Sequence, residues 1–297
     1  MYISIVGSSS IIYHHIQAAK KNSFKILYIY TSNKDSKNVK KLVKKFKIKK
    51  IYYNWKSFVK DSAEKKSSIL IAGQISQNKK ILEECLKYDL KVIIEKPVFT
   101  NSNIFQKFLK FKKNIFIGYN RIYYSGIEKL ETILKKNKIH NVIIKCPETN
   151  KKNITLNSCH IFSIIYYLFG KLSLIKKIKL KENIFCIFKN RKNCYFYIFF
   201  NFNCPENFSI EFNFKKKKLI LCPIEKLISY NKLNVKISKK LTSYEPNIEF
   251  TVSDKTKKIK PGFEKQYLNF KKFISEKKCK MINVEDAQSI VKSCNSI

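Results

Sequence analysis

One lysine of this sequence stands where a side chain could act on a bound ligand. The apolar run Val92-Ile93-Ile94 is followed by Glu95, Lys96 and Pro97. If the run is a buried strand of a parallel sheet, Lys96 follows its carboxyl end, which is where ligands bind in such sheets. An ammonium group there can hold a hydroxyl or carbonyl oxygen and move a proton. The alternative, in a lysine-rich chain, is a solvated side chain.

A glycine and three serines follow the first apolar run. The segment Gly7-Ser8-Ser9-Ser10-Ile11 opens a predicted helix, whose N-terminal amides could bind a pyrophosphate. Only the first glycine of a dinucleotide-binding turn is present, because Ser9 and Ile12 stand at the other two positions. The serine hydroxyls can add donors. The segment therefore predicts either a phosphate-binding turn or an ordinary turn between a strand and a helix.

The second predicted strand ends in polar residues without an acid, Thr31-Ser32-Asn33-Lys34. In NAD-selective folds a carboxylate at this point binds the ribose hydroxyls. Because Thr31 and Ser32 carry no charge and Lys34 is nearby, a 2′-phosphate would be tolerated. The segment favours NADP slightly over NAD, and the alternative is a plain polar turn.

The elements that must position these residues alternate in type over the first 118 residues. Short apolar runs predict strands and lie between amphipathic stretches that predict helices, the pattern of an α/β domain with a parallel sheet. The predicted strands are 2–6, 25–30, 50–53, 68–72, 91–95 and 114–118, and the predicted helices are 11–21, 37–46, 78–87 and 101–111.

The pattern changes after Tyr119. Strand-like runs rich in β-branched and aromatic residues predict an α+β domain with a mostly antiparallel sheet. We expect helices at 124–136, 157–168, 263–275 and 284–294, strands at 141–145, 174–180, 183–188, 193–202, 207–214 and 218–222, and a polar loop at 253–261. Two domains follow: residues 1–119 for dinucleotide binding, and residues 120–297 for substrate binding and oligomerisation.

With its motifs in place, the sequence resembles the Gfo/Idh/MocA family of NAD(P)-dependent oxidoreductases over nearly its whole length. Glu95-Lys96-Pro97 is the family's E-K-P signature, and the segment from Gly7 to His15 stands at its G-x-G-x-x-G-x-x-H start. Gly118-Tyr119-Asn120-Arg121 is similar to the segment that joins the two family domains. The stretch from Asn157 to His160, with Gly170 ten residues after the His, is similar to the family's catalytic helix.

The resemblance implies roles for particular residues. Lys96 would bind and polarise the reacting sugar oxygen, His160 would exchange the hydroxyl proton, and Asn157 would orient the substrate or the imidazole. The alternatives are a His packed against the core and an Asn that caps a helix. The cofactor-binding set implied is Gly7, Ser8, Ser9, Ser10, Ile11, Thr31, Ser32, Ala72, Gln74, Asn78, Glu95, Lys96, Pro97, Asn120 and Arg121.

Several positions depart from the family pattern. Where the family has an Asp before the His, this chain has Asn157 or Leu156, and the later Asp is Ser163. An amide cannot carry the negative charge that stabilises an imidazolium. The segment from Ile71 to Asn78 also lacks the Thr-Pro and the His of the family. We therefore expect an active site that is altered or lost.

Charge dominates the composition. The chain of 297 residues has 61 Lys and Arg against 21 Asp and Glu, a net charge of +40, but only Arg121 and Arg191 are arginines. Specific nucleic-acid readers depend on the bidentate guanidinium group. Lys, Ile, Asn, Tyr and Phe are abundant together, which fits a genome-wide coding bias better than one basic face. We expect neither a nucleic-acid nor a membrane partner.

Nine cysteines occur without a C-x-x-C pair, so the sequence predicts neither a metal site nor a disulfide framework. Such cysteines suit a reduced cytoplasm. The first lysine is Lys20, so we expect no secretory signal. The longest apolar stretches are shorter than the roughly 18 residues of a spanning helix, so we expect no membrane span.

The leading hypothesis is a cytoplasmic NAD(P)-dependent oxidoreductase, expected to be a homo-oligomer. It would transfer a hydride at a secondary alcohol or ketone of a sugar or sugar nucleotide. Surface-polysaccharide synthesis is a setting that the resemblance implies. The second hypothesis is a catalytically degenerate relative that binds nucleotide or sugar. A third, a basic nucleic-acid binder, requires one contiguous positive face.

Overall fold

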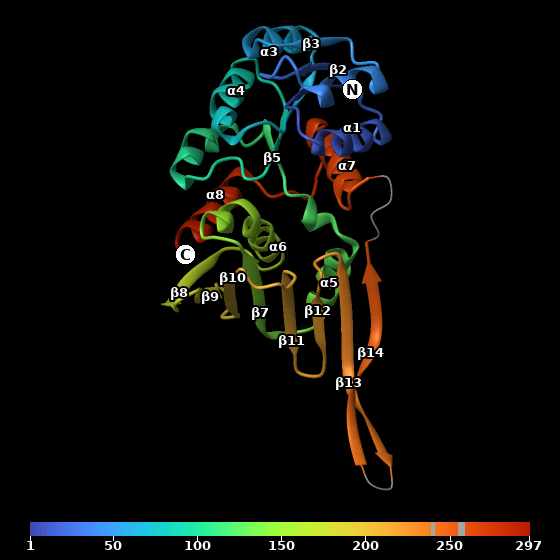
Figure 1. Cartoon of the computed structure of the whole chain (residues 1–297), viewed down its shortest axis with the longest axis vertical. Coiled ribbons are helices and arrows are strands. Elements are labelled where there is room, and N and C mark those ends of the chain that lie inside the picture. The colour runs from blue at the N-terminus through green and yellow to red at the C-terminus, as the bar shows by residue number, and fades with distance from the viewer. Residues whose placement is uncertain (239–240, 255–258) are drawn as a thin grey trace. The chain divides into compact units, whose positions relative to one another are not determined.

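The chain divides into two compact units (Figure 1) in a computed structural model that describes residues 1–238, 241–254 and 259–297. Unit 1 comprises Met1–Asn120 and Thr256–Lys292, and unit 2 comprises Arg121–Lys255 and Ser293–Ile297. From the sequence we expect a boundary after Tyr119 and one domain beyond it. In the structure, the described residues 259–292 cluster with unit 1.

Six parallel strands form the sheet of unit 1, in the order β3-β2-β1-β4-β5-β6. This order is that of the dinucleotide-binding fold, in which ligands lie across the carboxyl ends of the strands. Each strand agrees with its predicted run to within one residue. The strands are β1 (Tyr2–Val6), β2 (Lys25–Tyr30), β3 (Lys50–Tyr52), β4 (Ser68–Ile71), β5 (Val92–Glu95) and β6 (Ile115–Gly118).

The helices of unit 1 include one that the sequence pattern did not predict, α3, which Asn54 caps by accepting hydrogen bonds from the N–H groups of Lys56 and Ser57. The predicted helix at 101–111 is a 3₁₀ helix. The helices are α1 (Ile11–Lys21), α2 (Lys37–Phe46), α3 (Trp55–Glu64), α4 (Ile75–Lys87), η1 (Ser102–Phe111) and α7 (Phe263–Ile274), and α8 (Val284–Asn295) continues into unit 2.

Aromatic packing explains why α7 belongs to unit 1. The ring of Phe270 stacks on Phe24 at 5.9 Å and meets Phe116 edge-on at 5.5 Å between centroids. Phe270, Phe116 and Tyr267 are almost fully buried. Burying side chains of this size stabilises the unit by roughly 2 kcal/mol each, so α7 is part of its core.

Within the described residues, the sheet of unit 2 has eight strands in the order β14-β13-β12-β11-β7-β10-β9-β8, of which only β7 and β10 pair in parallel. The predicted fold class, a parallel Rossmann-type domain plus a mostly antiparallel α+β domain, is confirmed. The strands are β7 (Ile139–Glu148), β8 (Leu172–Lys179), β9 (Asn183–Asn190), β10 (Tyr195–Phe202), β11 (Ser209–Phe214), β12 (Lys218–Leu221), β13 (Lys226–Ser238) and β14 (Leu241–Ser253).

The helix predicted at 157–168 is α6 (Cys159–Phe169), which begins two residues later than predicted. A π-helical turn, η3 (Ile154–Ser158), comes directly before it. The others are η2 (Asn120–Tyr123) and α5 (Ser125–Leu134). Eight residues of α6 are buried, from Cys159 to Tyr166. A helix buried on all sides is part of the core and holds its side chains in place.

The long hairpin of β13 and β14 was not predicted. Its outer part extends beyond the other strands of the sheet (Figure 1), and Leu233, Val235 and Ile237 are more than half exposed. Strand side chains alternate between faces, so these three share one face, where they pair with Pro246, Tyr244 and Thr242. Of the loop predicted at 253–261, residues 255–258 lie outside the described residues.

Two further observations concern the whole chain. All nine cysteines are free, and six of them are buried. Within the described residues, no helix has the length and apolar character that crossing a membrane requires.

Candidate nucleotide-binding cleft and the helix of His160

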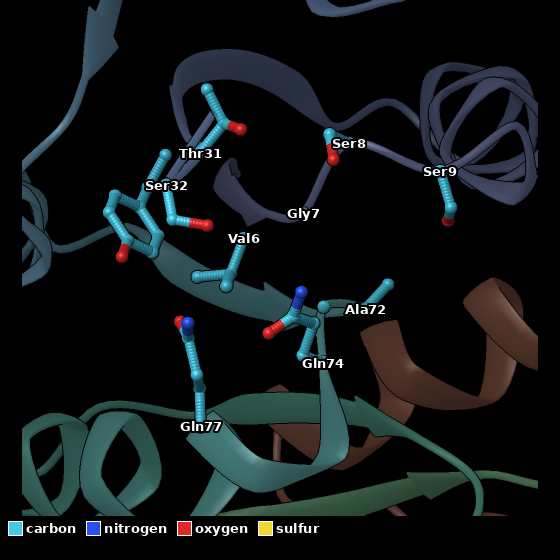
Figure 2. Close-up of a pocket in the computed structure, with 11 residues that line it drawn as sticks. Val6, Gly7, Ser8, Ser9, Thr31, Ser32, Ala72, Gln74 and Gln77 are labelled. Atoms are coloured by element: carbon cyan, nitrogen blue, oxygen red, sulfur yellow. The ribbon is translucent and has the colours of Figure 1, made fainter. Parts of the chain in front are cut away.

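A cleft of about 200 Å³ lies at the carboxyl ends of β1, β2 and β4 (Figure 2). This is the end of the sheet at which the dinucleotide-binding fold holds its ligand. Among the predicted cofactor residues, Gly7, Ser8, Ser9, Thr31, Ser32, Ala72 and Gln74 line it, together with Val6, Tyr30, Gly73 and Gln77.

Gly7 is required by space and by backbone conformation. Its φ of +130° is one that other residues rarely adopt, and a Cβ atom would lie 2.4 Å from the carbonyl oxygen of Ala72. The Gly7 N–H donates to the Tyr30 carbonyl at 2.9 Å, so the turn is tied to the end of β2. The one glycine kept from the turn motif is thus the one that lets the chain pass close to β4.

The other two glycine positions hold larger residues. Ile12 is fully buried, and its Cδ1 atom comes within 3.0 Å of the place a Gly7 Cβ would occupy. Ser10 precedes α1 without a side-chain capping bond, and neither it nor Ile11 lines the cleft. The buried side chain of Ile12 therefore packs beside Gly7, at a position where the motif usually has a glycine.

Asn38 on α2 fixes the orientation of the serine turn. Its Nδ2 donates to the carbonyl oxygens of Ser8 at 2.8 Å and Ser9 at 3.0 Å. Because the C=O and N–H of a trans peptide point in opposite directions, the N–H groups of Ser9 and Ser10 face away from α2. Amides that are turned outward at the start of a helix can bind a phosphate.

The far end of the cleft is polar and uncharged. Thr31 accepts from the N–H of Asn33 at 3.1 Å and closes a tight turn, while Ser32 is exposed. Burial raises the pKa of Tyr30, so its phenol is neutral. The side chains of Gln74 and Gln77 rise from the start of α4 toward the strand ends (Figure 2). Among the described residues lining the cleft, none carries a charge.

Glu95 belongs to a buried polar group that joins three elements. His15 of α1 is fully buried, with its Nε2 3.2 Å from Glu95 Oε1 and its Nδ1 3.1 Å from the hydroxyl of Tyr267 on α7. A Cβ at Gly118 would come within 2.7 Å of the same Glu95 oxygen. The acid before Lys96 is thus packed against helix and strand, and burial raises the pKa of Tyr267 well above its usual range.

The remaining predicted residues of unit 1 lie beside the cleft or away from it. Lys96 is half-buried and follows β5, and its peptide bond to Pro97 is cis. Asn78 is buried and donates to the Val98 carbonyl at 2.9 Å, which holds the segment after Pro97. Asn120 donates to the Pro261 carbonyl at 3.1 Å. Arg121, the next residue, belongs to unit 2.

In unit 2, His160 is the second residue of α6 and is 9% exposed. The exposed Asn157, three residues earlier, donates from Nδ2 to Glu148 Oε2 at 3.2 Å. Ser158 donates to the other oxygen of Glu148 at 2.5 Å. The predicted Asn is therefore bound to a carboxylate that the sequence analysis does not single out.

Two of the residues missed could have been found. Glu148 continues the alternation of Val142, Ile144 and Cys146 on the buried side of β7, but Pro147 argued against extending the strand so far. Gln77 lies one helical turn from Gln74. Asn38 carried no signal, because nothing in its neighbourhood indicates contact with residues 8 and 9.

Among the described residues, no group of three His, Cys, Asp or Glu side chains is placed to hold a metal ion. The outward amides of the serine turn and the uncharged polar walls of the cleft fit a phosphate-bearing organic ligand.

Comparisons with known proteins agree with this description. Residues 1–114 match the family model GFO_IDH_MocA, described as "Oxidoreductase family, NAD-binding Rossmann fold". No curated protein gives a significant match.

Solved structures share the fold of the whole chain at low identity. A dehydrogenase (MviM) from Clostridium difficile is 14% identical with a TM-score of 0.77, over 100% of this chain and 98% of its own. UDP-N-acetylglucosamine 3-dehydrogenase GnnA from Acidithiobacillus ferrooxidans is 8% identical with a TM-score of 0.74, over 100% and 96%. An oxidoreductase from Agrobacterium radiobacter in complex with NAD+, L-tartaric acid and magnesium is 11% identical with a TM-score of 0.72, over 99% and 95%.

The strand order, the glycine turn and the matched residues agree on one assignment for the first part of the chain. Residues 1–114 form an NAD-binding Rossmann domain of the Gfo/Idh/MocA oxidoreductase family.

Proposed function

We propose that this protein is an NAD(P)-dependent oxidoreductase that transfers a hydride at a secondary alcohol or ketone of a sugar or sugar nucleotide. The observation that carries the proposal is the position of Lys96 next to the cleft. Ile71 of β4 pairs with Ile94 of β5. Ala72, which lines the cleft, directly follows Ile71. Lys96 comes two residues after Ile94, just beyond the end of the neighbouring strand β5.

The residues of unit 1 would bind the cofactor and the reacting oxygen. The cleft is smaller than the roughly 300 Å³ at which sites for drug-sized ligands begin, so it would hold one part of the dinucleotide. The N–H groups of Ser9 and Ser10 would donate to phosphate oxygens, and Lys96 would bind the substrate oxygen. Bound NAD(P) supplies a nicotinamide ring that accepts or donates hydride.

In unit 2, His160 would exchange the proton of the substrate hydroxyl. An imidazole is suited to this exchange near neutral pH. During oxidation the hydroxyl proton passes to His160 as the carbon-bound hydrogen leaves with its electron pair. Reduction runs the same transfers in reverse.

For the cofactor we propose a preference for NADP over NAD. The support is the lining of the cleft at Thr31 and Ser32, where no carboxylate stands among the described lining residues to bind the ribose hydroxyls.

For the substrate class, the support is the resemblance of the motif residues and the fold shared with a protein named as a UDP-N-acetylglucosamine 3-dehydrogenase. A sugar nucleotide is therefore the first substrate to test.

We also propose that the protein is a cytoplasmic homo-oligomer. A lone two-stranded ribbon is marginally stable in water, and one face of the outer hairpin carries Leu233, Val235 and Ile237. Light scattering on the chain and on Val235→Lys would test this, because a charge on that face should lower the molecular mass in solution.

A second candidate is a relative that binds nucleotide without turnover. The observation in its favour is the buried Ile12 at a position where the dinucleotide-binding turn has glycine. Such a protein would bind cofactor, and Lys96→Ala would change nothing measurable.

Melting curves with NADH and NADPH test cofactor binding. A ligand at about 100 times its Kd adds about 2.7 kcal/mol to the stability of the folded chain, which raises Tm by roughly 5 °C or more. No rise with either cofactor at millimolar concentration would contradict both candidates.

Turnover separates the two candidates. With a panel of UDP-sugars and NAD+ or NADP+, we expect reduced cofactor to appear at 340 nm. Lys96→Ala should keep the rise in Tm and lose at least about 100-fold in kcat/KM. Lys20→Ala, a change to an exposed lysine on α1, is the control and should match the unchanged chain.

A further inference from the structure

Glu148 is a carboxylate placed in an apolar row. It is the last residue of β7 and only 4% exposed. Because side chains alternate along a strand, it faces the same side as Val142, Ile144 and Cys146, all of which are fully buried. Burying a carboxylate is costly unless it receives hydrogen bonds, so its partners indicate what it is there for.

Each oxygen of Glu148 accepts a bond from the segment before His160. Ser158 Oγ donates to Oε1 at 2.5 Å, and Asn157 Nδ2 donates to Oε2 at 3.2 Å. Two accepting oxygens are the pattern of an ionised carboxylate, and the short bond to Ser158 is typical of a hydroxyl bound to an anion.

This carboxylate lies at the start of the helix that carries His160. Ser158 is the residue before α6, and His160 is the second residue within it. The π-helical turn Ile154–Ser158 runs directly into α6, so Glu148 lies against the junction of the two helical segments. The arrangement therefore combines a buried carboxylate, two neutral donors and the imidazole at this junction.

The cysteine thiols near Glu148 are protonated and carry no charge. Burial raises the pKa of Cys146 and of Cys294 far above neutral pH, and the nearby Glu148 raises both further. Cys159 is buried and donates to the Leu156 carbonyl at 3.5 Å. Glu206, which lies between β10 and β11, accepts a hydrogen bond from Asn201 at 2.6 Å and lies 3.4 Å from Lys145.

We propose that Glu148 is a positioning residue that, through Asn157 and Ser158, holds the first turn of α6 in place and supplies the negative charge that stabilises His160 when it takes up the substrate proton. The inference rests on the proposed function of His160. It accounts for the Asn at position 157: the negative charge comes from β7, and the amide links it to the helix.

The balance of the step is simple. The O–H bond of the substrate breaks and its proton bonds to an imidazole nitrogen of His160. The C–H bond would break with its electron pair passing to bound NAD(P), and the alcohol would become a carbonyl. Glu148 would exchange no proton in this step.

Glu148→Gln tests the charge with little change of shape. We expect kcat to fall about 10- to 100-fold, while KM and the cofactor-induced rise in Tm stay within about twofold and about 1 °C. The matched control is Glu206→Gln, which removes another hydrogen-bonded carboxylate of unit 2 and should leave kcat unchanged. Wild-type kcat in Glu148→Gln would overturn the proposal.

The reciprocal double variant Glu148→Gln/Asn157→Asp separates charge from structure. It exchanges the amide and the carboxylate across the same contact, and we expect it to recover at least about tenfold in kcat over Glu148→Gln. Asn157→Asp alone puts two carboxylates in contact and should lower Tm. No recovery in a double variant with wild-type Tm would contradict a role for the charge.

A readout without turnover keeps this test apart from the proposed function. The imidazole of His160, followed by NMR through a pH titration, should have its pKa lowered by about 0.5 to 1 in Glu148→Gln and left in place by Glu206→Gln. An unchanged His160 titration would overturn the proposal even if the chain had no turnover. A lowered pKa in a chain without turnover would support the pairing and reject the oxidoreductase activity.

Discussion

The serine turn of unit 1 and the start of α6 in unit 2 both depart from the motif they resemble, but in different ways. In the turn, the constraint is space: Gly7 is kept because β4 passes within contact distance, while Ser9 and Ile12 replace the other glycines. At the start of α6 the difference concerns charge: position 157 holds an amide, and Glu148 places a carboxylate against it. Space is set by the local backbone, whereas charge can come from any neighbouring strand.

Gly7→Ala should have the largest effect, because it tests the constraint of space. The added Cβ would overlap the Ala72 carbonyl, and the backbone conformation disfavours it, so we expect a loss of roughly 3 kcal/mol or more. Trp55, the single tryptophan, lies in unit 1 and reports its unfolding by fluorescence in urea.

The adjacent glycine provides the control for that experiment. Gly73→Ala brings the new Cβ no closer than 3.5 Å to its neighbours and should cost less than about 1 kcal/mol. Equal losses for the two variants would show that the turn is not limited by the approach to β4.

His15→Ala tests the buried group behind Lys96. It leaves Glu95 Oε1 and the Tyr267 hydroxyl without this partner, so we expect a loss of about 2 to 3 kcal/mol, again followed by Trp55 fluorescence. His14→Ala, on the same helix, removes a 3.3 Å hydrogen bond from the Lys260 N–H and ring contacts with Tyr13 and Phe263, and should cost about 0.5 kcal/mol. A larger loss of stability for His14→Ala than for His15→Ala would show that His14, and not His15, is the histidine that stabilises the fold.

Asn38→Ala tests whether the hydrogen bonds from Asn38, which orient the serine turn, compensate for the glycines that the turn lacks. The serine carbonyls would lose their donor, and we expect Kd for NADPH to rise about tenfold, a cost of about 1.4 kcal/mol, measured by titration calorimetry. Asn33→Ala, a nearby change in the turn after β2, serves as the control. An unchanged Kd in Asn38→Ala would show that the turn is ordered without its clamp.

The smallest effect concerns an ordinary carboxylate of unit 2. The hydrogen bond from Asn201 is the main cause that holds the pKa of Glu206 below its usual value of 4.5. A lowered pKa in the folded chain contributes stability above that value, which is lost as the pH falls through the folded pKa. In urea titrations from pH 6 to pH 3, Glu206→Gln should lose stability less steeply, by under about 1 kcal/mol. Identical pH curves would contradict the shift.

Much of unit 1 could be predicted from sequence because its signals are local. Short apolar runs between amphipathic helices determine the parallel sheet, and each strand was predicted to within one residue. Helix α3 was missed although Trp55, Phe58 and Val59 follow helical spacing and Asn54 is a good capping residue. The hairpin of β13 and β14 was missed although Leu233, Val235 and Ile237 alternate with polar residues as a strand requires.

The sites were predictable only where chemistry and position coincide in the sequence. Lys96 follows its strand directly, and its place could be deduced. Glu148 and Asn38 depend on contacts with residues 9 to 30 positions away. No periodicity records such contacts, because they arise when separately formed elements pack together.

The return of the chain to unit 1 has a consequence for how the protein is made. Helix α7 provides Phe270 for the aromatic core and Tyr267 for the contact with His15, yet both are translated only after residues 121–255 of unit 2. A nascent chain released from the ribosome before residue 263 would expose Phe24 and Phe116 to solvent. Residues 1–120 must therefore wait for the synthesis of α7 before their core is complete.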